Sequence, residues 1–438
     1  MDPAPTRCWA AVSGGGDSVV LFHLLAELAP SMPWSLGIVH VHHGLHAEAD
    51  EWERRVKALA EAHAVPFQVF HVDARPRPGI SPEAAAREAR YGAWRDWLAP
   101  GEAVVTAHHA DDQAETLLLQ LLRGSGPHGL AAMPAVAGLG HGRLLRPLLE
   151  TDRETIRRWA GERGLEWIED PSNRDLRHDR NYLRHRILPG LRERWPSLAA
   201  TLHRAATLQA ETAGLLDALA EADLAACRRD GLLQAATVLG LPEARQRNLL
   251  RYWIASAGHP IPSRAVLERI RQDVLGARPD AEPRVRWADS EVRRHRGRVY
   301  LLHALPDRPP ADIPDWDLQP RYFPELGRTL RLGPAVGEGI AMRRLESGRW
   351  TVRFRRGGER IRPAGQAHHR PLKHLLQEAG MPPWERRILP LLWCDSELVA
   401  VPGICVAEGW QAEAGEAGRL PVWEPAPPVP LPLPASES

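Results

Sequence analysis

The sequence predicts an α/β protein, with a doubly wound parallel sheet at the N-terminus, then a helical domain and a small α+β domain. Three observations support this fold class. Strand-like and helix-like segments alternate through the first part of the chain, a glycine-rich turn joins the first strand to the first helix, and strand signals vanish between residues 198 and 280. Repeated βα units of this length are typical of a parallel sheet covered by helices.

The N-terminal elements follow one another as four βα units. Short apolar runs predict four strands, at 9–12, 36–41, 67–72 and 103–107. Apolar residues at helical spacing predict four helices, at 19–28, 48–63, 82–98 and 111–122. Ser81 and Pro82 suit the N-cap and the first position of the third helix.

Composition divides the chain into five expected segments. Residues 1–198 form the α/β domain, and residues 199–304, rich in Ala, Leu, Arg and Glu, predict a helical domain that ends in a hairpin at 284–303. Residues 305–340, rich in Pro and Gly, predict an irregular linker before a third domain at 341–424. The tail, 425–438, has six prolines in ten residues and is expected to be extended and disordered.

Charge and cysteine usage exclude several classes of protein. The 438 residues include 56 Lys and Arg against 55 Asp and Glu, which excludes a uniformly basic nucleic-acid-binding protein but not local basic patches. Four cysteines without a CxxC pair argue against a disulfide scaffold or a cysteine zinc site. No stretch reaches the ~18–20 uncharged apolar residues of a membrane span, and the N-terminus does not resemble a signal peptide. We therefore expect a cytoplasmic protein with no membrane partner.

The turn after the first strand, Ser13-Gly14-Gly15-Gly16-Asp17-Ser18, predicts a phosphate-binding loop. Three glycines let the backbone turn tightly, so that several N–H groups converge on a phosphate at the helix N-terminus. Ser13 and Ser18 add hydroxyl donors, and Asp17 can hold a magnesium ion or orient an amine. The alternative is a purely structural glycine turn. The patterns GxxxxGK[ST] and GxGxxG are both absent.

A second polar segment, 106–116, follows the fourth strand and begins the fourth helix. Asp112 and Glu115 are three residues apart and share a helical face, with His108 one turn earlier. Three interpretations are open: helix capping by Asp111 or Asp112, a metal site, or a pocket that binds a cationic amine and takes its proton. We favour the amine pocket, because an amine with a pKa of ~10.4 is inert while protonated and carboxylates both attract it and accept its proton.

Four histidines, His40, His42, His43 and His46, follow the second strand, at the edge where such a sheet meets a nucleotide base. The main chain there is the predicted contact with the base. A metal site built from the imidazoles is the alternative.

A basic strip lies in the third domain. Residues 343–373 hold nine Arg and one Lys against Glu346 and Glu359, a local net charge of +8. Such a strip can bind a phosphate backbone, and Trp350 and Trp384 can add stacking on bases. The alternative is a solvated face of a sheet.

These motifs carry a family resemblance. SGGGDS after a first strand resembles the signature of the PP-loop ATP pyrophosphatases, which have a Rossmann-like sheet. HHADDQAETLLLQLLRGSGPHGLAAM (108–133) and HVHHGL (40–45) closely resemble stretches of the tRNA(Ile)-lysidine synthetases. Further motifs agree: AREARY (86–91), RPLL (146–149), WIEDPSN (167–173), RNYLR (180–184), RRGGERIRP (355–363), HRPLKHLL (369–376) and PPWER (382–386). The resemblance spans 9–198, weakens to 303 and is strong again over 353–410.

The resemblance implies a ligase that acts on an isoleucine tRNA with a CAU anticodon. ATP adenylates the 2-carbonyl oxygen of the wobble cytidine and pyrophosphate leaves; the ε-amine of L-lysine then displaces AMP and gives lysidine. The implied cofactors are ATP and Mg²⁺. The resemblance implies that the ATP phosphates are held by Ser13, Gly14, Gly15, Gly16, Asp17 and Ser18, and that Asp17 also reaches Mg²⁺. It implies that lysine is recognised by His108, Asp112 and Glu115, and that Arg184, with Arg180 and Asn181 nearby, stabilises the departing pyrophosphate. Arg123 is implied to contact tRNA or the reacting nucleotide, Arg355, Arg356, Lys373 and Trp384 of the third domain to bind tRNA, and the helical domain to help hold the tRNA body.

Two other functions compete with this interpretation. A PP-loop tRNA thiolase generally needs cysteines near its site, whereas Cys8 precedes the first strand and the remaining cysteines lie beyond residue 226. A tRNA-binding protein with a vestigial ATP site would not be expected to keep both polar motifs intact.

Overall fold

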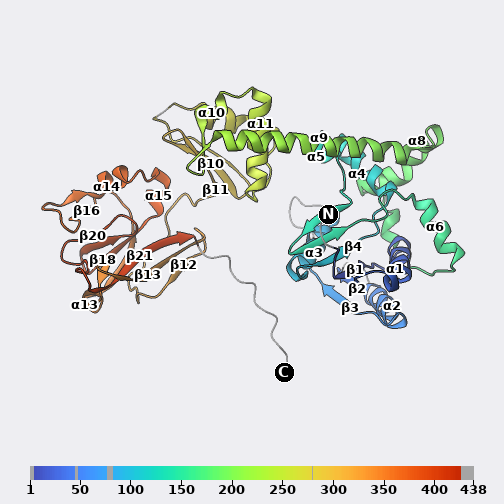
Figure 1. Ribbon diagram of the computed structural model, residues 1–438, viewed down its shortest axis with the longest axis horizontal. Helices are drawn as coiled ribbons and strands as arrows, with labels where there is room; N and C mark the ends of the chain where they lie inside the picture. The colour runs from blue at the N-terminus through green and yellow to red at the C-terminus, as the bar shows by residue number, and fades with distance from the viewer. Residues whose placement is uncertain (1–3, 45–47, 76–81, 279, 426–438) are drawn as a thin grey trace. The chain divides into compact units, whose positions relative to one another are not determined.

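The computed structural model describes residues 4–44, 48–75, 82–278 and 280–425 (Figure 1). The chain divides into two compact units, Met1–Ala218 (unit 1) and Leu219–Ser438 (unit 2), and the division falls inside helix α9, Leu198–Cys227. Most of the tail that we expected to be disordered, from residue 426 onward, lies outside the described residues, as does Ser81. Within the described ranges, no helix is long and apolar enough to cross a membrane.

The described part of unit 1 contains a six-stranded sheet with the order β3-β2-β1-β4-β6-β5. Every neighbouring pair is parallel except β5 with β6. Its strands are β1 Arg7–Ala11, β2 Ser35–His42, β3 Phe67–His71, β4 Glu102–Val105, β5 Val136–Leu139 and β6 Gly142–Leu145. The four predicted parallel strands are confirmed; the β5–β6 hairpin at the edge was not predicted.

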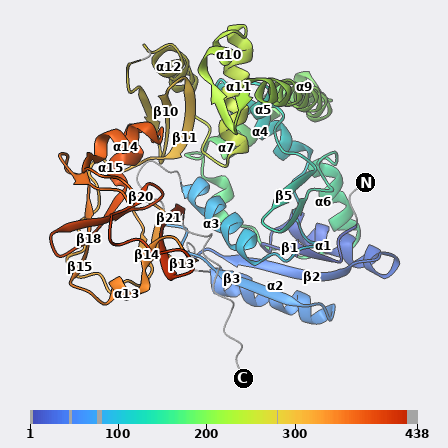
Figure 2. The same ribbon diagram turned by 60° about the vertical axis from the view of Figure 1, so that its left-hand side comes forward.

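Helices cover both faces of this sheet. They are α1 Gly16–Leu28, α2 Ala49–Ala62, α3 Pro82–Trp97, α4 Ala110–Leu122, α5 Pro127–Leu130, α6 Arg153–Glu162, α7 Asp179–Tyr182 and α8 Leu188–Arg194. Apolar residues of α1, α2 and α6 pack in one core with β1 and β2, and Trp94 of α3 packs in a second core with Trp9 and Val104. Figure 2 shows α2 running beside β2 and β3. The doubly wound α/β fold is therefore confirmed.

The first part of unit 2 is less helical than predicted. After α9 come α10 Ala235–Leu239, α11 Glu243–Ser256 and α12 Arg264–Arg269, which pack on a five-stranded antiparallel sheet of the described residues, ordered β7-β8-β11-β10-β9. Its strands are β7 Arg228–Arg229, β8 Leu232–Gln234, β9 Arg284–Trp287, β10 Ser290–His295 and β11 Arg298–His303. The expected hairpin at 284–303 is present, but it forms three strands and pairs with the short β8.

The second part of unit 2 corrects the expected linker at 305–340. Strands β12 Arg321–Phe323 and β13 Arg328–Val336 lie inside that segment, and β13 pairs along its whole length with β21, Ala417–Pro425. Gly333 and Pro334 interrupt the apolar pattern of β13, and its partner strand lies far along the chain, so local composition could not reveal the pairing. The remaining elements are β14 Ile340–Ala341, α13 Met342–Leu345, β15 Trp350–Phe354, β16 Arg360–Ile361, β17 Arg370–Pro371, α14 Leu372–Glu378, α15 Pro383–Ile388, β18 Pro390–Cys394, β19 Glu397–Val401 and β20 Cys405–Val406.

Candidate active site

The predicted phosphate loop lies between the end of β1 and the start of α1. Gly14 has a φ of +93°, a conformation that L side chains rarely adopt, and α1 begins at Gly16. The Ser18 hydroxyl donates to the carbonyl of Gly15 at 2.8 Å and accepts from the N–H of Ser13 at 3.2 Å. These bonds hold the conformation of the loop. Backbone N–H groups of the loop, at the positive end of α1, are then placed to bind a phosphate.

A neighbouring segment packs directly against the loop. The N–H of Ile168 donates to the carbonyl of Gly14 at 2.9 Å, and a Cβ on Gly14 would lie 2.8 Å from Ile168 Cδ1. A Cβ on Gly16 would lie 3.3 Å from the ring of Trp167. Backbone conformation and close approach thus both favour glycine at position 14, whereas at position 16 only the tight contact with Trp167 does.

The second predicted motif meets this loop through His109, which precedes the first residue of α4. His109 is 1% exposed, and its Nε2 lies 3.4 Å from a carboxylate oxygen of Asp17 and 3.4 Å from one of Asp112. The N–H of His109 donates to Asp112 at 3.1 Å, so Asp112 also caps the helix. One imidazole thus joins the two polar segments that we predicted from the sequence, and the capping alternative for Asp112 holds alongside its place in the site.

The electrostatics keep both carboxylates ionised. Burial alone would raise the pKa of Asp17, but the hydrogen bond and charge of His109, with the charges of Arg153 and Arg184, hold that pKa below its usual value. Burial would also raise the pKa of Asp112, but the charges of His109 and Arg180 outweigh burial and leave that pKa lowered. Burial lowers the pKa of His108 to about 3, so this imidazole stays neutral at physiological pH, with its Nδ1 2.8 Å from the hydroxyl of Thr106.

Glu115 lies at the centre of an arginine cluster. Its side chain is 1% exposed and accepts from Arg184 Nε at 2.7 Å, from Arg184 Nη2 at 2.9 Å and from Arg180 Nε at 3.0 Å. Arg184 also donates to Asp112 at 3.2 Å. Arg180 lies in α7, and Arg184 lies one turn later, in the π-helical turn Leu183–Ile187. Both side chains therefore point to Glu115. The structure therefore brings Asp112 and Glu115, predicted for lysine, into one cluster with Arg180 and Arg184, predicted for pyrophosphate, whereas His108 is bonded to Thr106.

Three further residues belong to this site: His109 and Arg153, to which the sequence-based prediction gave no role, and Asp111, which it named only as a candidate helix cap. His109 was quoted only as part of a motif. Asp111 accepts from the backbone N–H of Arg153 at 2.9 Å and pairs with Arg192. Arg153 begins α6, and its Nε is buried with no hydrogen-bond partner among the described residues, which suits it to an anion beside Asp17. Its only sequence signal is its place after the helix-capping Asp152.

Two predicted residues of unit 1 lie in other surroundings. The amide of Asn181 is buried and donates to the carbonyls of Ser172 and Asp175, so it holds the loop before α7. Arg123 is exposed at the C-terminal end of α4, which at 1.5 Å per residue lies ~20 Å from the end that carries His109. Arg123 therefore lies apart from the carboxylate cluster, and its contact with tRNA or the reacting nucleotide stays a prediction.

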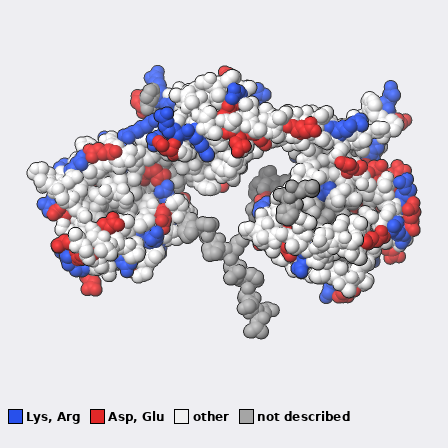
Figure 3. All heavy atoms as spheres, in the orientation of Figure 1, with Lys and Arg blue, Asp and Glu red and all other residues white. Residues whose placement is uncertain are grey.

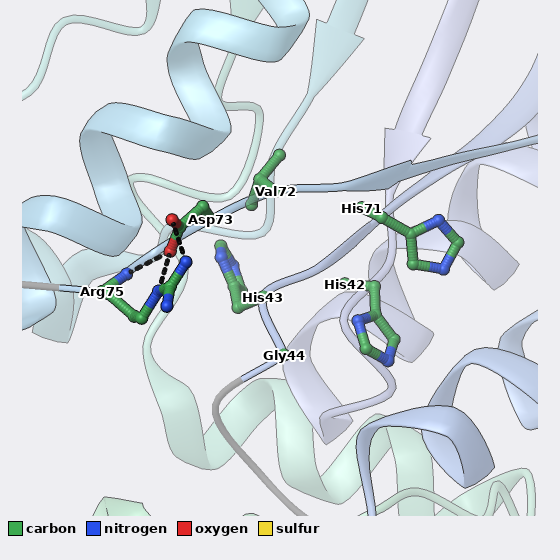
Figure 4. Close-up of a pocket in the computed structure, with 7 residues that line it drawn as sticks. All are labelled: His42, His43, Gly44, His71, Val72, Asp73 and Arg75. Atoms are coloured by element: carbon green, nitrogen blue, oxygen red, sulfur yellow. Dashed lines mark hydrogen bonds and ion pairs between the residues drawn. The ribbon is translucent and has the colours of Figure 1, made fainter.

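A cavity of about 560 Å³ opens at the carboxyl ends of β2 and β3, and Figure 4 shows the side chains around it. Its lining consists of His42, His43, Gly44, His71, Val72, Asp73 and Arg75. His40 is buried away from it, with Nδ1 2.8 Å from the carbonyl of Val12, so it supports the strand that leads into the phosphate loop. His46 lies outside the described residues.

The predicted tRNA-binding residues of unit 2 differ in accessibility. Lys373 is exposed on α14, Arg356 pairs with Asp312, and Arg355 lies 3.5 Å from Glu359. Trp384 corrects our expectation of stacking on a base, because its ring is 3% exposed and packs edge-on against Tyr300. Trp384 is instead a core residue that joins α15 to β11.

The basic strip is also less basic than its sequence suggests. Acidic residues from outside 343–373 pair with its arginines: Asp315 with Arg349, Glu378 with Arg370, and Glu416 with Arg343. Figure 3 accordingly shows blue and red side chains interleaved. Several arginines of this strip are therefore ion-paired, and which of its residues contact tRNA stays a prediction.

At the carboxyl edge of the parallel sheet, a glycine-rich phosphate loop meets the carboxylate-bearing start of α4. This arrangement defines a nucleotide-binding enzyme domain of the PP-loop class. In agreement, the sequence profile of the PP-loop domain matches residues 2–191, that of the TilS substrate binding domain matches 233–300, and that of the TilS substrate C-terminal domain matches 350–423.

The tRNA(Ile)-lysidine synthase of Coxiella burnetii is 42% identical over 93% of this chain and 91% of its own length. That of Methylococcus capsulatus is 46% identical over 90% of both chains, and that of Alkalilimnicola ehrlichii is 45% identical over 95% of this chain and 93% of its own. The chain belongs to the tRNA(Ile)-lysidine synthase family.

Proposed function

We propose that this chain is an ATP-dependent ligase that joins L-lysine to the C2 atom of the wobble cytidine in tRNA(Ile) with a CAU anticodon. The reaction passes through an adenylated cytidine and yields lysidine, AMP and pyrophosphate. The observation that carries the proposal is the meeting of Asp17, from the phosphate loop, with Asp112, from the first turn of α4, on the same nitrogen of His109. Phosphate chemistry and amine chemistry are thereby supported within one site.

In the first step the phosphate loop holds ATP while the cytidine 2-oxygen attacks the α-phosphate. The N–H groups at the start of α1 bind phosphate oxygens, and Arg153, with its buried Nε, stabilises the charge that develops on pyrophosphate. Asp17, an ionised carboxylate beside this loop, is the residue suited to Mg²⁺, which would neutralise phosphate charge when bound. The O–P bond forms and the bond between the α- and β-phosphates breaks.

In the second step the carboxylates bind the lysine ammonium. Asp112 and Glu115 are ion-paired with Arg180 and Arg184, so incoming lysine competes with these guanidinium groups for the same oxygens. The bound ammonium first gives a proton to a carboxylate, because only the neutral amine has the lone pair that attacks C2. As this nitrogen bonds to C2, its acidity rises sharply, and even a weakly basic carboxylate can accept the second proton that it then loses. The C2–O bond breaks and AMP leaves with the oxygen.

The cysteines agree with this assignment and with a cytoplasmic enzyme. All four lie in the described ranges and are free, as is usual in a reducing compartment. Cys8, the one nearest the site in sequence, is buried, and burial raises the pKa of its thiol to about 11, which leaves it unsuited to sulfur transfer.

The test is incorporation of labelled lysine into a tRNA(Ile) transcript with a CAU anticodon, with ATP and Mg²⁺. A transcript with uridine at the wobble position is the matched control. Label on the first transcript alone, with AMP released, supports the proposal. Wobble-dependent AMP release without label would overturn lysine as the nucleophile, and absence of both would overturn the ligase.

A further inference from the structure

Three side chains outside the phosphate loop and the first turn of α4 bring ligand atoms close together. His42 ends β2, His71 ends β3, and Glu53 lies on α2. One ligand atom from each lies within 4.8 Å of the other two. Figure 4 shows the rings of His42 and His71 next to one another, apart from the Asp73–Arg75 pair.

Each imidazole of this cluster already faces a carboxylate. His71 Nε2 lies 2.9 Å from Glu53, and His42 Nε2 lies 2.9 Å from Asp50. The two ring centroids are 4.9 Å apart. The His42 side chain is 13% exposed and that of Glu53 is 24% exposed, so two of the three ligands are held by their surroundings. Two imidazole nitrogens and one carboxylate that converge in this way, with a second carboxylate beside His42, form a donor set for a cation.

We propose that His42, Glu53 and His71 bind one divalent transition metal ion of the zinc class, with Asp50 or water as the fourth ligand. Tetrahedral zinc with bonds of about 2.0–2.1 Å places its ligand atoms about 3.4 Å apart. The present spacing of up to 4.8 Å closes to that value through rotation of His71, whose side chain is 62% exposed. Imidazole ligands favour Zn²⁺, Ni²⁺ or Cu²⁺ over Mg²⁺, which prefers oxygen.

A bound ion would cross-link three elements at the edge of the cavity. His42 and His71 both line the cavity, and Glu53 would tie α2 to the ends of the two strands. The cluster shares no residue with the one that holds Asp17, Asp112 and Glu115, so its test does not depend on the proposed reaction. Because the unfolded chain lacks the arrangement, a bound ion stabilises unit 1 by mass action.

The experiment is titration of the untagged, full-length chain with ZnCl₂ in saturating Mg²⁺, followed by calorimetry and by the melting temperature. His71→Gln and Glu53→Gln remove ligands, and His63→Gln is the matched control. His63 pairs with His23, with ring centroids 5.0 Å apart, and belongs to no such cluster among the described residues. Absorption of the Co²⁺-loaded chain reports the coordination geometry.

We expect one Zn²⁺ per chain and a rise in melting temperature. Affinity should fall at least tenfold in His71→Gln and in Glu53→Gln, stay unchanged in His63→Gln, and be accompanied by the strong visible bands of four-coordinate Co²⁺. Absence of saturable binding would overturn the proposal. Equal affinity in all variants would place the ion elsewhere and overturn it as well.

Discussion

Replacing Glu115 with glutamine tests the cluster at the centre of the proposed lysine site. The carboxylate is 1% exposed and accepts three charged hydrogen bonds from two arginines. Glutamine keeps the size of the side chain but offers one acceptor oxygen and an NH₂ group that faces an arginine N–H. One contact becomes repulsive, and the other two lose their charge.

The magnitude follows from these contacts. Removing one partner of a buried ion pair costs about 3–5 kcal/mol, and because the amide retains two neutral bonds we expect a loss of about 3 kcal/mol in the stability of unit 1. Lysine loses one charge-assisted contact of about 1.5–3 kcal/mol, so kcat/KM for lysine should fall roughly 10- to 150-fold. Pyrophosphate release in the absence of lysine should change much less, because the phosphate loop is untouched.

The assays are urea unfolding and lysine-dependent formation of labelled tRNA. Glu102→Gln is the matched control: its carboxylate accepts from Trp9 Nε1 at 3.2 Å and lies 3.6 Å from Arg7, at the start of β4 and away from the site. The control should lose some stability and keep its use of lysine. An unchanged kcat/KM for lysine in Glu115→Gln, or an equal fall in the control, would refute the reasoning.

Four further changes have defined outcomes. Asp17→Asn should slow tRNA-dependent pyrophosphate release at least ~100-fold without unfolding the chain, since it removes the ionised group beside the phosphate loop; full activity would exclude Asp17 from the site. Gly14→Ala, at φ +93° and 2.8 Å from Ile168 Cδ1, should cost about 1–2 kcal/mol and raise the KM for ATP, and an unchanged KM would show that the loop tolerates a side chain. Trp384→Ala should destabilise unit 2 by about 3–5 kcal/mol; a fall in tRNA affinity at unchanged stability would restore a stacking role. Lys373→Ala should lower the salt slope of tRNA binding by about one, and an unaltered slope would remove this contact.

The order of the N-terminal elements was predictable because each strand and helix carries its own pattern. The four parallel strands and their helices appear where apolar periodicity places them, within one to three residues. The β12 and β13 strands were not predictable, since β13 is completed by β21 and its own sequence contains Gly333 and Pro334. A strand whose partner is distant leaves only a weak local signal.

The chemical content of the site was also readable from the sequence. A glycine-rich turn between a strand and a helix, and two carboxylates on one helical face, specify phosphate and amine chemistry through local geometry alone. Asp17, Asp112 and Glu115 were named on that basis and Arg184 through the family resemblance, and the fold brings them together. Their roles in the reaction stay predictions.

Contacts and ion pairs between residues far apart in the sequence were revealed only by the tertiary structure. His109 joins Asp17 to Asp112 because the ends of β1 and β4 are adjacent in the sheet, and Asp315 and Glu416 neutralise arginines that look unopposed in sequence. Local periodicity reports which face of an element is buried, whereas burial and ion pairing at one point depend on every segment that packs there. For that reason the sequence identifies the loops and their chemistry, and the packing determines which charges remain available.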